Sequence, residues 1–330
     1  MKFLIAGLGS IGRRHLRNLH ALGQEDILLY RTHQATLPDV ELSDYTTFTE
    51  LSLALAEKPD GVIIANPTAL HLEVAIASAK AGAALLIEKP ISDSLAGLGE
   101  LQSALKQSGK PAVVGFHFRF HPVLNQVKTL LESRQLGKPL SARAHWGEYL
   151  PGWHPWEDYR RSYAARADLG GGVVNTLSHP LDYLRWLLGE VESVSGWTGN
   201  LSELKLDVED HADILIRFAA GAAASLHLDY YQRPPSHTLE ITCENGRVCW
   251  DNASGEAQVF HAQSGAVDLL VPPEGFERNQ MFLDEMATFV RLCHGEKLPH
   301  CTLADGIRAQ ELVLAIKQSA AQSSCMVRLA

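Results

Sequence analysis

Three polar side chains in the middle of the chain have a spacing that suits acid–base chemistry. Asn175, His179 and Asp182 are separated by four and then three positions, so on a helix they share one face. Histidine titrates near neutral pH, and His179 could accept the hydroxyl proton of an alcohol while a hydride leaves the same carbon. The alternatives are a packing role for His179 and a simple ion pair between Asp182 and a neighbour such as Arg185.

A second polar group follows two short apolar runs that predict parallel strands. Its members are Asn66, Pro67, His71, Glu88, Lys89 and Pro90. Ligands of open α/β sheets bind at the carboxyl ends of such strands. We therefore expect Lys89 to face a cofactor cleft, although a solvated strand end is the alternative. His71 is expected to pack at a helix start near the cofactor.

A glycine motif follows the first apolar run and opens the first amphipathic segment. The residues expected to contact a cofactor there are Gly7, Gly9, Ser10, Ile11 and Gly12. Gly7 permits a tight turn, Gly9 lets the backbone approach a pyrophosphate, and Gly12 allows close packing of helix on strand. The N–H groups of the helix start face the anion. This arrangement predicts a dinucleotide site.

The second strand ends without the carboxylate that usually binds the adenosine ribose of NAD. Arg31 and Thr32 stand there instead. An arginine can pair with a ribose phosphate and a threonine can donate a hydrogen bond to it. The sequence thus predicts a preference for NADP(H), with NAD(H) as a possible cofactor. Alternatively, Arg31 is a solvated surface residue.

An aromatic and basic stretch precedes the central glycines and could contact a substrate. Aromatic rings stack on sugar rings, and arginines bind carboxylates or phosphates. Trp153, Tyr159 and Arg160 are therefore candidate substrate contacts. The alternative is ordinary packing of the rings and pairing of the arginine with nearby acids on a loop.

The first third of the chain alternates apolar runs with helical periodicity, which predicts a parallel sheet covered by helices on both faces. The predicted strands are Lys2–Ala6, Ile27–Tyr30, Gly61–Ala65, Ala84–Ile87 and Pro111–Gly115. The predicted helices are Ile11–Leu22, Phe48–Ala56, Ala69–Ala81 and Leu95–Gln107.

The pattern changes after about Phe120 and predicts a mainly antiparallel sheet with helices on one face. A long helix is expected over Leu169–Leu188, and two further helices over Asn279–Cys293 and Leu303–Ala321. The predicted strands are Val191–Thr198, Ala212–Phe218, Ala222–Tyr230, Thr238–Cys243, Arg247–Trp250, Gln258–His261 and Val267–Val271.

Composition excludes several classes of protein. The 330 residues carry a formal net charge of −9, which argues against a nucleic-acid backbone as the main partner. No apolar run is long enough to span a bilayer, and the amino terminus does not resemble a secretion signal. Five cysteines without a C-x-x-C pair suit free thiols in a reducing cytoplasm. The histidines, including His117 and His121, show no completed ligand set, so no metal site is expected.

The combination of these motifs resembles the Gfo/Idh/MocA family of oxidoreductases. The resemblance spans essentially the whole chain and includes Arg119 near the end of the first third. It implies a Rossmann domain, placed here at residues 1–120, followed by an α/β domain at residues 121–330 that binds substrate and forms a homodimer or homotetramer through its open sheet. It also implies an NAD(P)-dependent oxidoreductase of sugars, cyclitols or their derivatives.

By the same resemblance, Lys89 corresponds to the catalytic lysine and His179 to the general acid/base. Arg119, Asn175 and Asp182 are candidate substrate contacts. Asn175 departs from the aspartate that the family often has at that position, and an asparagine cannot accept a proton. His179 must then work alone, with Asn175 orienting the substrate, or with Asp182 as its partner. Alternatively, the protein is a catalytically inactive sensor or partner-binding protein. A second enzymatic alternative, implied by relatives in this family, is a glycosidase-like enzyme that oxidises its sugar transiently.

Overall fold

The computed structural model describes residues 1–32, 37–155 and 157–329. The chain forms two compact units, and neither is continuous in sequence. The first consists of Met1–His117, Asp168–Gly170 and Arg278–Gln310. The second consists of Phe118–Ala167, Gly171–Glu277 and the chain from Glu311 onward. A single boundary at residue 120 stays a prediction.

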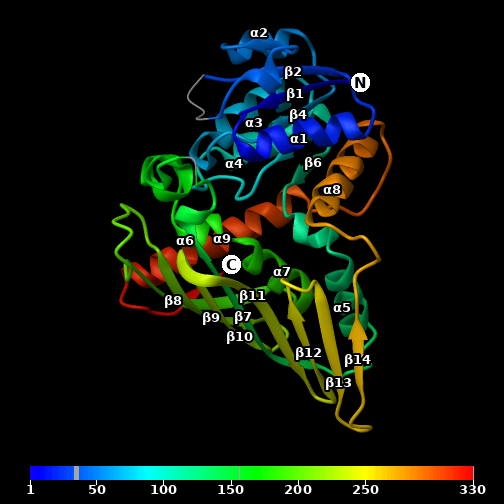
Figure 1. Ribbon diagram of the computed structural model, residues 1–330, viewed down its shortest axis with the longest axis vertical. Helices are drawn as coiled ribbons and strands as arrows, with labels where there is room; N and C mark the ends of the chain where they lie inside the picture. The colour runs from blue at the N-terminus through cyan, green and yellow to red at the C-terminus, as the bar shows by residue number, and fades with distance from the viewer. Residues whose placement is uncertain (33–36, 156, 330) are drawn as a thin grey trace. The chain divides into compact units, whose positions relative to one another are not determined.

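The first unit contains, within its described residues, a six-stranded parallel sheet in the order β3-β2-β1-β4-β5-β6 (Figure 1). The strands are β1 (Lys2–Ala6), β2 (Asp26–Tyr30), β3 (Thr46–Phe48), β4 (Gly61–Ile64), β5 (Ala84–Ile87) and β6 (Ala112–Val114). The strand order reverses direction between β1 and β4, and ligands of doubly wound sheets bind at that point. The predicted parallel sheet is confirmed.

Helices cover both faces of this sheet, because its strands are apolar on both sides. They are α1 (Ser10–Ala21), α2 (Leu51–Ala56), α3 (His71–Lys80), α4 (Leu98–Ser108) and α8 (Arg278–Cys293). Leu4 packs in one core layer with residues of α3 and α4. Phe3 and Ile5 pack in the other layer with residues of α1 and α8.

One predicted helix of this unit is too long. The segment Phe48–Ala56 was expected to be helical, but α2 begins at Leu51 and Phe48 ends β3. Phe48 pairs with Tyr30 of β2, and its carbonyl accepts a hydrogen bond from the backbone N–H of Arg31. This pairing at the sheet edge overrides the helical periodicity.

The second unit contains, within its described residues, a nine-stranded sheet in the order β14-β13-β12-β11-β7-β10-β9-β8-β15. The strands are β7 (Pro139–Tyr149), β8 (Val191–Gly199), β9 (His211–Phe218), β10 (Ala223–Asp229), β11 (Tyr231–Cys243), β12 (Gly246–Asp251), β13 (Glu256–His261), β14 (Val267–Leu270) and β15 (Val327–Arg328). β7 runs parallel to β10, whereas the other neighbouring strands are antiparallel. The mainly antiparallel sheet is therefore confirmed.

Among the described residues, helices lie against one face of this sheet, and the other face is open, with many exposed side chains. The helices of the unit are α5 (Pro122–Glu132), α6 (Val173–Thr176), α7 (His179–Leu188) and the later part of α9 (Leu303–Ala321). In β7 the small or aromatic Ala142, Ala144 and Trp146 are buried, while Arg143 between them is exposed. Leu215 of β9 is 63% exposed on the open side.

The predicted helix over Leu169–Leu188 is wrong as a single element. The segment instead forms α6 and α7, separated at Leu177 and Ser178. Pro180 lies in the first turn of α7, where it cannot donate to the carbonyl of Thr176 and its ring would clash with that carbonyl in a continuous helix. None of the helices among the described residues is both long enough and apolar enough for a membrane span.

Candidate functional site

The glycine turn after β1 is shaped by contacts that exclude side chains. Gly7 has φ of +96°, and a Cβ there would overlap the backbone of Asn66. A Cβ at Gly12 would overlap the carbonyl oxygen of Gly7, which shows how closely α1 approaches the turn. A Cβ at Gly9 would meet no described atom within 4 Å. Packing therefore explains Gly7 and Gly12, and the free space at Gly9 fits the approach of a pyrophosphate.

The start of α1 presents donors beside this space. Gly9 is the N-cap residue of α1 and supplies no side-chain cap. Ser10 is exposed and Ile11 is partly exposed at the first turn. The first backbone N–H groups of a helix lack partners within the helix and favour an anion. These residues fit the phosphates of a dinucleotide.

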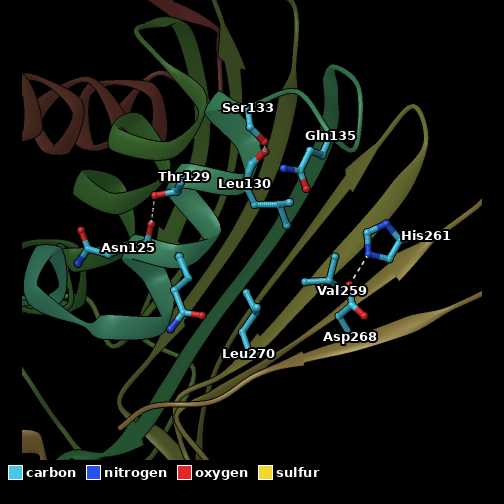
Figure 2. Close-up of a pocket in the computed structure, with 10 residues that line it drawn as sticks. Asn125, Thr129, Leu130, Ser133, Gln135, Val259, His261, Asp268 and Leu270 are labelled. Carbon is cyan, nitrogen blue, oxygen red and sulfur yellow. Dashed lines mark hydrogen bonds and ion pairs between the residues drawn. The ribbon is translucent and has the colours of Figure 1, made fainter.

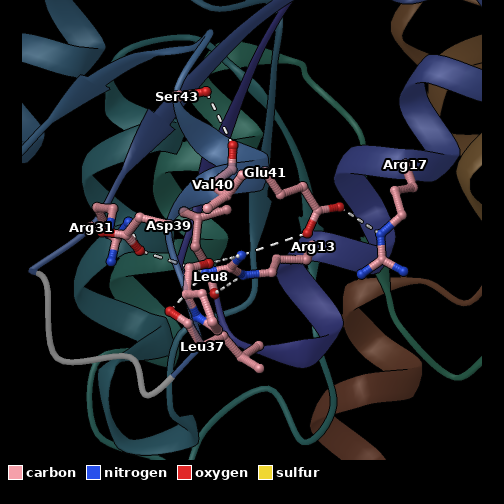
Figure 3. Close-up of polar contacts among 10 residues, drawn as sticks. Leu8, Arg13, Arg17, Arg31, Leu37, Asp39, Val40, Glu41 and Ser43 are labelled. Atoms are coloured by element: carbon pink, nitrogen blue, oxygen red, sulfur yellow. Dashed lines mark hydrogen bonds and ion pairs between the residues drawn. The ribbon is translucent and has the colours of Figure 1, made fainter.

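The end of β2 carries a buried arginine that is held by an acid (Figure 3). Arg31 is 7% exposed, and its Nη1 donates to Asp39 Oδ1 over 2.7 Å. Asp39 is also 3.7 Å from Nη2 of Arg13, whose Nη1 donates to the carbonyl of Pro38. Thr32 is exposed next to Arg31. Arg31 is thus not a solvated surface side chain, and a ribose phosphate would have to compete with Asp39 for it.

Glu88, directly after β5, is buried and pairs with a histidine of α1. Its Oε1 lies 2.6 Å from Nε2 of His15, which is fully buried. Burial alone would raise the pKa of Glu88, but the hydrogen bond and charge of His15, together with Lys89, lower it. Glu88 is therefore ionised. The sequence indicated Glu88 but missed His15, which lies three positions after Gly12 on the helix that the glycine turn opens.

Lys89 follows Glu88 at the same sheet edge as the glycine turn. It is partly exposed, and its backbone N–H donates to Glu88 Oε2 over 3.2 Å. Burial lowers the pKa of His117 well below its ordinary value, and the charges of Arg278, Lys89, Arg14 and His15 lower it further. Lys89, Arg14 and Arg278 therefore lie near enough to His117 for their charges to act on it.

The loop after β4 is fixed by His71, the first residue of α3. Its Nδ1 lies 2.9 Å from the carbonyl oxygen of Pro90, and its Nε2 lies 2.8 Å from that of Asn66. Burial lowers the pKa of His71, against the effect of these two backbone hydrogen bonds. His71 is therefore buried at the start of α3, and its position near a cofactor stays a prediction. Asn66 Oδ1 is buried without a hydrogen-bond partner among the described residues, and Pro67 precedes the turn Thr68–Leu70.

His179 lies in the second unit, in a buried aromatic environment. It is 2% exposed, and its ring is 5.0 Å from that of Phe118 and 5.8 Å from that of Trp146. It begins α7, so its orientation is set by the helix start. Because Lys89 lies in the first unit, joint action of Lys89 and His179 stays a prediction.

Asn175 does not share a helix with His179, contrary to the expectation from their spacing. It lies in α6, is 2% exposed, and its Nδ2 donates to the carbonyl of Gly171 over 3.1 Å. A Cβ at Gly171 would overlap the carbonyl oxygen of Tyr163. Gly171 therefore leaves room for the backbone at Tyr163, and the hydrogen bond from Asn175 holds the glycine segment in place.

Asp182 and Arg119, both candidate substrate contacts, bind each other. Nε and Nη2 of Arg119 donate to the two carboxylate oxygens of Asp182 over 2.9 and 2.7 Å. The side chains are 11% and 2% exposed. Arg185, the neighbour expected to pair with Asp182, donates to Glu190 over 2.9 and 2.6 Å. A bidentate pair of this kind orients the α7 face that contains His179.

The aromatic and basic stretch is held largely by its own contacts. Tyr159 donates to the carbonyl of Leu204 over 3.0 Å, and the guanidinium of Arg160 lies 4.7 Å from the Tyr159 ring centre. Arg160 also pairs with Asp158 at 3.4 Å. Trp153 packs edge-on against Tyr230, with ring centres 5.7 Å apart. Packing and local pairing, the alternative to substrate contact, are observed for all three candidates.

A separate cavity of about 470 Å³ lies in the second unit between α5 and the β13–β14 hairpin (Figure 2). Asn125 and Thr129 line it from α5, Ser133 lines it from the C-cap of that helix, and His261 and Asp268 line it from the strands, 2.8 Å apart. Neither Lys89 nor His179 lines this cavity. It is therefore no candidate for the oxidoreductase site.

Comparisons with known proteins agree with this description. Residues 1–116 match the oxidoreductase family with an NAD-binding Rossmann fold, and residues 124–249 match the GFO/IDH/MocA C-terminal domain. The chain is 30% identical to scyllo-inositol 2-dehydrogenase (NAD(+)) of Bacillus subtilis (strain 168), over 96% of this chain and 92% of that protein. It is 27% identical to myo-inositol 2-dehydrogenase of Thermotoga maritima, over 97% and 96%.

A solved structure shows the same fold over the whole chain. Levoglucosan dehydrogenase in complex with NADH has a TM-score of 0.87 at 21% identity, and the match covers 100% of this chain and 99% of that one. The parallel sheet, its glycine turn and these matches define an NAD(P)-dependent oxidoreductase. The chain belongs to the Gfo/Idh/MocA family. The expected family, fold and enzyme class are therefore confirmed.

Proposed function

We propose that the protein transfers a hydride between a nicotinamide dinucleotide and a secondary hydroxyl or carbonyl of a sugar or cyclitol. The observation that supports this most directly is the position of Lys89, which follows β5 at the same sheet edge as the open space at Gly9. The two inositol dehydrogenases that match nearly the whole chain are named for their action on cyclitols.

The roles proposed for the chain's own groups follow from their chemistry. The Lys89 ammonium donates a hydrogen bond to the reacting oxygen and holds it in place. An imidazole nitrogen of His179 accepts the hydroxyl proton in oxidation and returns it in reduction. Asn175 takes no part in proton transfer, because an amide does not titrate, and it positions the glycine run through Gly171.

A bound nicotinamide dinucleotide would supply the hydride acceptor or donor. The residues proposed to hold it lie in the glycine turn, at the start of α1, at the end of β2 and in the loops after β4 and β5. They are Gly7, Gly9, Ser10, Ile11, Gly12, Arg31, Thr32, Asn66, Pro67, His71, Glu88, Lys89 and Pro90. The preference for NADP(H) is part of this proposal, because Arg31 replaces the usual acid.

The test compares variants at the two proposed catalytic residues. Lys89→Ala and His179→Ala are expected to lower kcat by about 10²–10⁴-fold with levoglucosan or inositols, whereas dinucleotide binding by His179→Ala stays near wild type. Lys80→Ala and His261→Ala are matched controls, because Lys80 pairs with Glu100 and His261 with Asp268 away from these residues. Turnover is followed by nicotinamide absorbance.

Two results would contradict the proposal. Turnover within tenfold of wild type in both variants would show that Lys89 and His179 are not catalytic residues. Cleavage of a glycoside without net change in nicotinamide absorbance would favour the glycosidase-like alternative. Assembly as a homodimer or homotetramer and a cytoplasmic location belong to the same proposal, supported by the open sheet face and by five free cysteines.

A further inference from the structure

Two histidines and two aspartates meet on the open face of the nine-stranded sheet, away from the helices of the second unit. They belong to the neighbouring strands β9 and β10, in which Asp213 lies opposite His227 and His211 lies opposite Asp229. Alternate residues of a strand share a face, so all four side chains project to the side opposite the buried Ile214 and Leu228.

The polar atoms of three of these residues already surround one point. Oδ1 of Asp213 lies 2.8 Å from Nδ1 of His227, and Oδ2 of Asp213 lies 3.0 Å from Nε2 of His211. The three possible ligand atoms all lie within 4.8 Å of one another. The ligand atoms of a tetrahedral zinc site are roughly 3.3 Å apart, so small side-chain rotations suffice to bind an ion.

The opposite nitrogens of both imidazoles have partners that orient them. Nε2 of His227 lies 3.1 Å from Oδ2 of Asp229, which is 1% exposed, and Nδ1 of His211 lies 2.7 Å from the Tyr231 hydroxyl. Oδ1 of Asp229 accepts the backbone N–H groups of Tyr231 and Gln232, which fixes the carboxylate. Metal-bound histidines characteristically donate their second N–H to such a carboxylate or oxygen.

His227 has a carboxylate oxygen at each ring nitrogen. A neutral imidazole donates only one proton, so one of these two contacts needs a second cation, either a proton or a metal ion. The position between Asp213 and His227 is therefore attractive to a positive charge.

We propose that Nε2 of His211, Nδ1 of His227 and the carboxylate of Asp213 bind one divalent transition-metal ion of the zinc class. Imidazole and carboxylate ligands suit such ions, whereas magnesium prefers oxygen ligands alone. Asp213 is 60% exposed in the single chain, so the fourth coordination position is left to water or to a group of a second copy that packs on the open face. The ion joins β9 to β10 and is separate from the proposed oxidoreductase chemistry.

A neighbouring set, His145, His227 and Asp229, also has the right atom types. It fits less well, because Asp229 already accepts three hydrogen bonds and Nε2 of His145 lies 2.6 Å from Oε1 of Gln232. His145 stacks on His227 with ring centres 4.8 Å apart, on the same face. It therefore provides a matched control.

The experiment is a Zn²⁺ titration of the full-length chain, without an affinity tag, after removal of metals with a chelator. Competition with a chromophoric chelator gives the stoichiometry and Kd, and Mg²⁺ is titrated in parallel. We expect one Zn²⁺ per chain, no Mg²⁺ binding, and a rise in the Tm with Zn²⁺. His211→Ala and Asp213→Ala are expected to weaken Zn²⁺ binding by more than about tenfold, and Tyr231→Phe by up to about tenfold.

His145→Ala is expected to bind Zn²⁺ within about twofold of wild type, since it keeps all three proposed ligands and their partners. The Tm of each variant in chelator shows whether it folds. Absence of saturable Zn²⁺ binding by the wild type overturns the proposal. Equal binding by all variants, which indicates adventitious surface binding, also overturns it, as does a loss in His145→Ala that matches the loss in Asp213→Ala.

Discussion

Arg31 shows how a single ion pair can govern the choice of cofactor. Its guanidinium is held by Asp39 at 2.7 Å, in the position where a ribose phosphate is proposed to bind. An aspartate there repels a phosphate and occupies the arginine that would bind it. The free-energy balance between these two partners of Arg31 should set the preference between NADP(H) and NAD(H).

We therefore predict that Asp39→Asn raises the ratio of kcat/KM with NADPH to that with NADH, by about tenfold for 1.4 kcal/mol of removed competition. Arg31→Ala should lower the ratio. Arg17→Ala is the control, because Arg17 is 64% exposed and pairs with Glu41 instead. A wild type that prefers NADH, together with an unchanged ratio in Asp39→Asn, would contradict the assignment.

Glu285 of α8 is a buried acid that should be protonated at neutral pH. It is 0% exposed, and neither carboxylate oxygen has a hydrogen-bond partner among the described residues. Burial raises the pKa of Glu285 well above its ordinary value, and the negative charge of Glu88 raises it further. The folded protein thus binds a proton that the unfolded chain releases above about pH 4.3.

A raised pKa in the folded state gives stability that is full at low pH and is lost as pH rises. The free energy of unfolding should fall by up to about 1.4 kcal/mol per pH unit between the unfolded and folded pKa values. Glu285→Gln keeps the neutral form and should remove this slope, as urea unfolding at several pH values will show. Glu100→Gln, at an exposed residue that pairs with Lys80, should leave the slope unchanged. A slope that persists in Glu285→Gln would show that groups other than Glu285 cause it.

At the scale of elements, the glycines in the turn between β1 and α1 serve two different purposes, helix packing and ligand binding. Gly12 is required because α1 approaches the turn too closely for a side chain, whereas Gly9 has free space and ordinary backbone angles of φ −72° and ψ −167°. An alanine at Gly9 is therefore tolerated by the protein itself.

We predict that Gly12→Ala lowers the free energy of unfolding by about 1–3 kcal/mol through overpacking and also weakens dinucleotide binding. Gly9→Ala should weaken dinucleotide binding while changing stability by less than about 0.5 kcal/mol. Urea unfolding and a fluorescence titration with NADH and NADPH measure the two effects. Normal dinucleotide binding by Gly9→Ala would contradict the proposed position of the pyrophosphate.

The sequence predicted elements best where burial leaves a clear pattern. β1, β2, β4, β5 and β6 are apolar on both faces, and their positions followed from this alone, whereas the short and exposed edge strand β3 was missed. β7 was missed because its buried residues include the small Ala142 and Ala144, which give a weak hydrophobic signal beside Arg143 and His145. The break between α6 and α7 was missed although Pro180 marked it.

The sequence indicated which residues belong to the candidate site better than it indicated the residues with which they form hydrogen bonds and ion pairs. Gly7, Gly12 and His71 were identified from local motifs. The partners Asp182 for Arg119, Glu88 for His15 and Asp39 for Arg31 depend on tertiary contacts between separate elements. The same holds for His211, Asp213 and His227, which only the register of β9 and β10 brings together. The expectation of no metal site came from sequence neighbours alone.

At the scale of the whole molecule, residues near the end of the chain complete the core of the first unit. Phe289 of α8 is 0% exposed, and its ring lies 6.2 Å from that of Phe3 in β1. Met286 of the same helix packs in the same core layer. The stability of the amino-terminal sheet therefore depends on a helix that a boundary at residue 120 would assign elsewhere.

We predict that Phe289→Ala lowers the free energy of unfolding by about 3–5 kcal/mol, the usual cost of a large core cavity. Hydrogen exchange should accelerate at the amides of β1 and β4, because Phe289 covers Phe3 and Gly61. Phe260→Ala, at a residue that is 39% exposed, should cost far less. Unchanged exchange in β1 would show that α8 does not support the sheet.

The late position of α8 affects how the protein is made. A ribosome releases the amino terminus first, so β1 and α1 emerge long before Met286 and Phe289 are translated. Until then, the apolar layer formed by Phe3, Ile5 and Leu19 lacks its cover. Nascent chains should thus expose this apolar surface during most of translation. Chaperones should stop binding it only when the final helices have left the ribosomal exit tunnel.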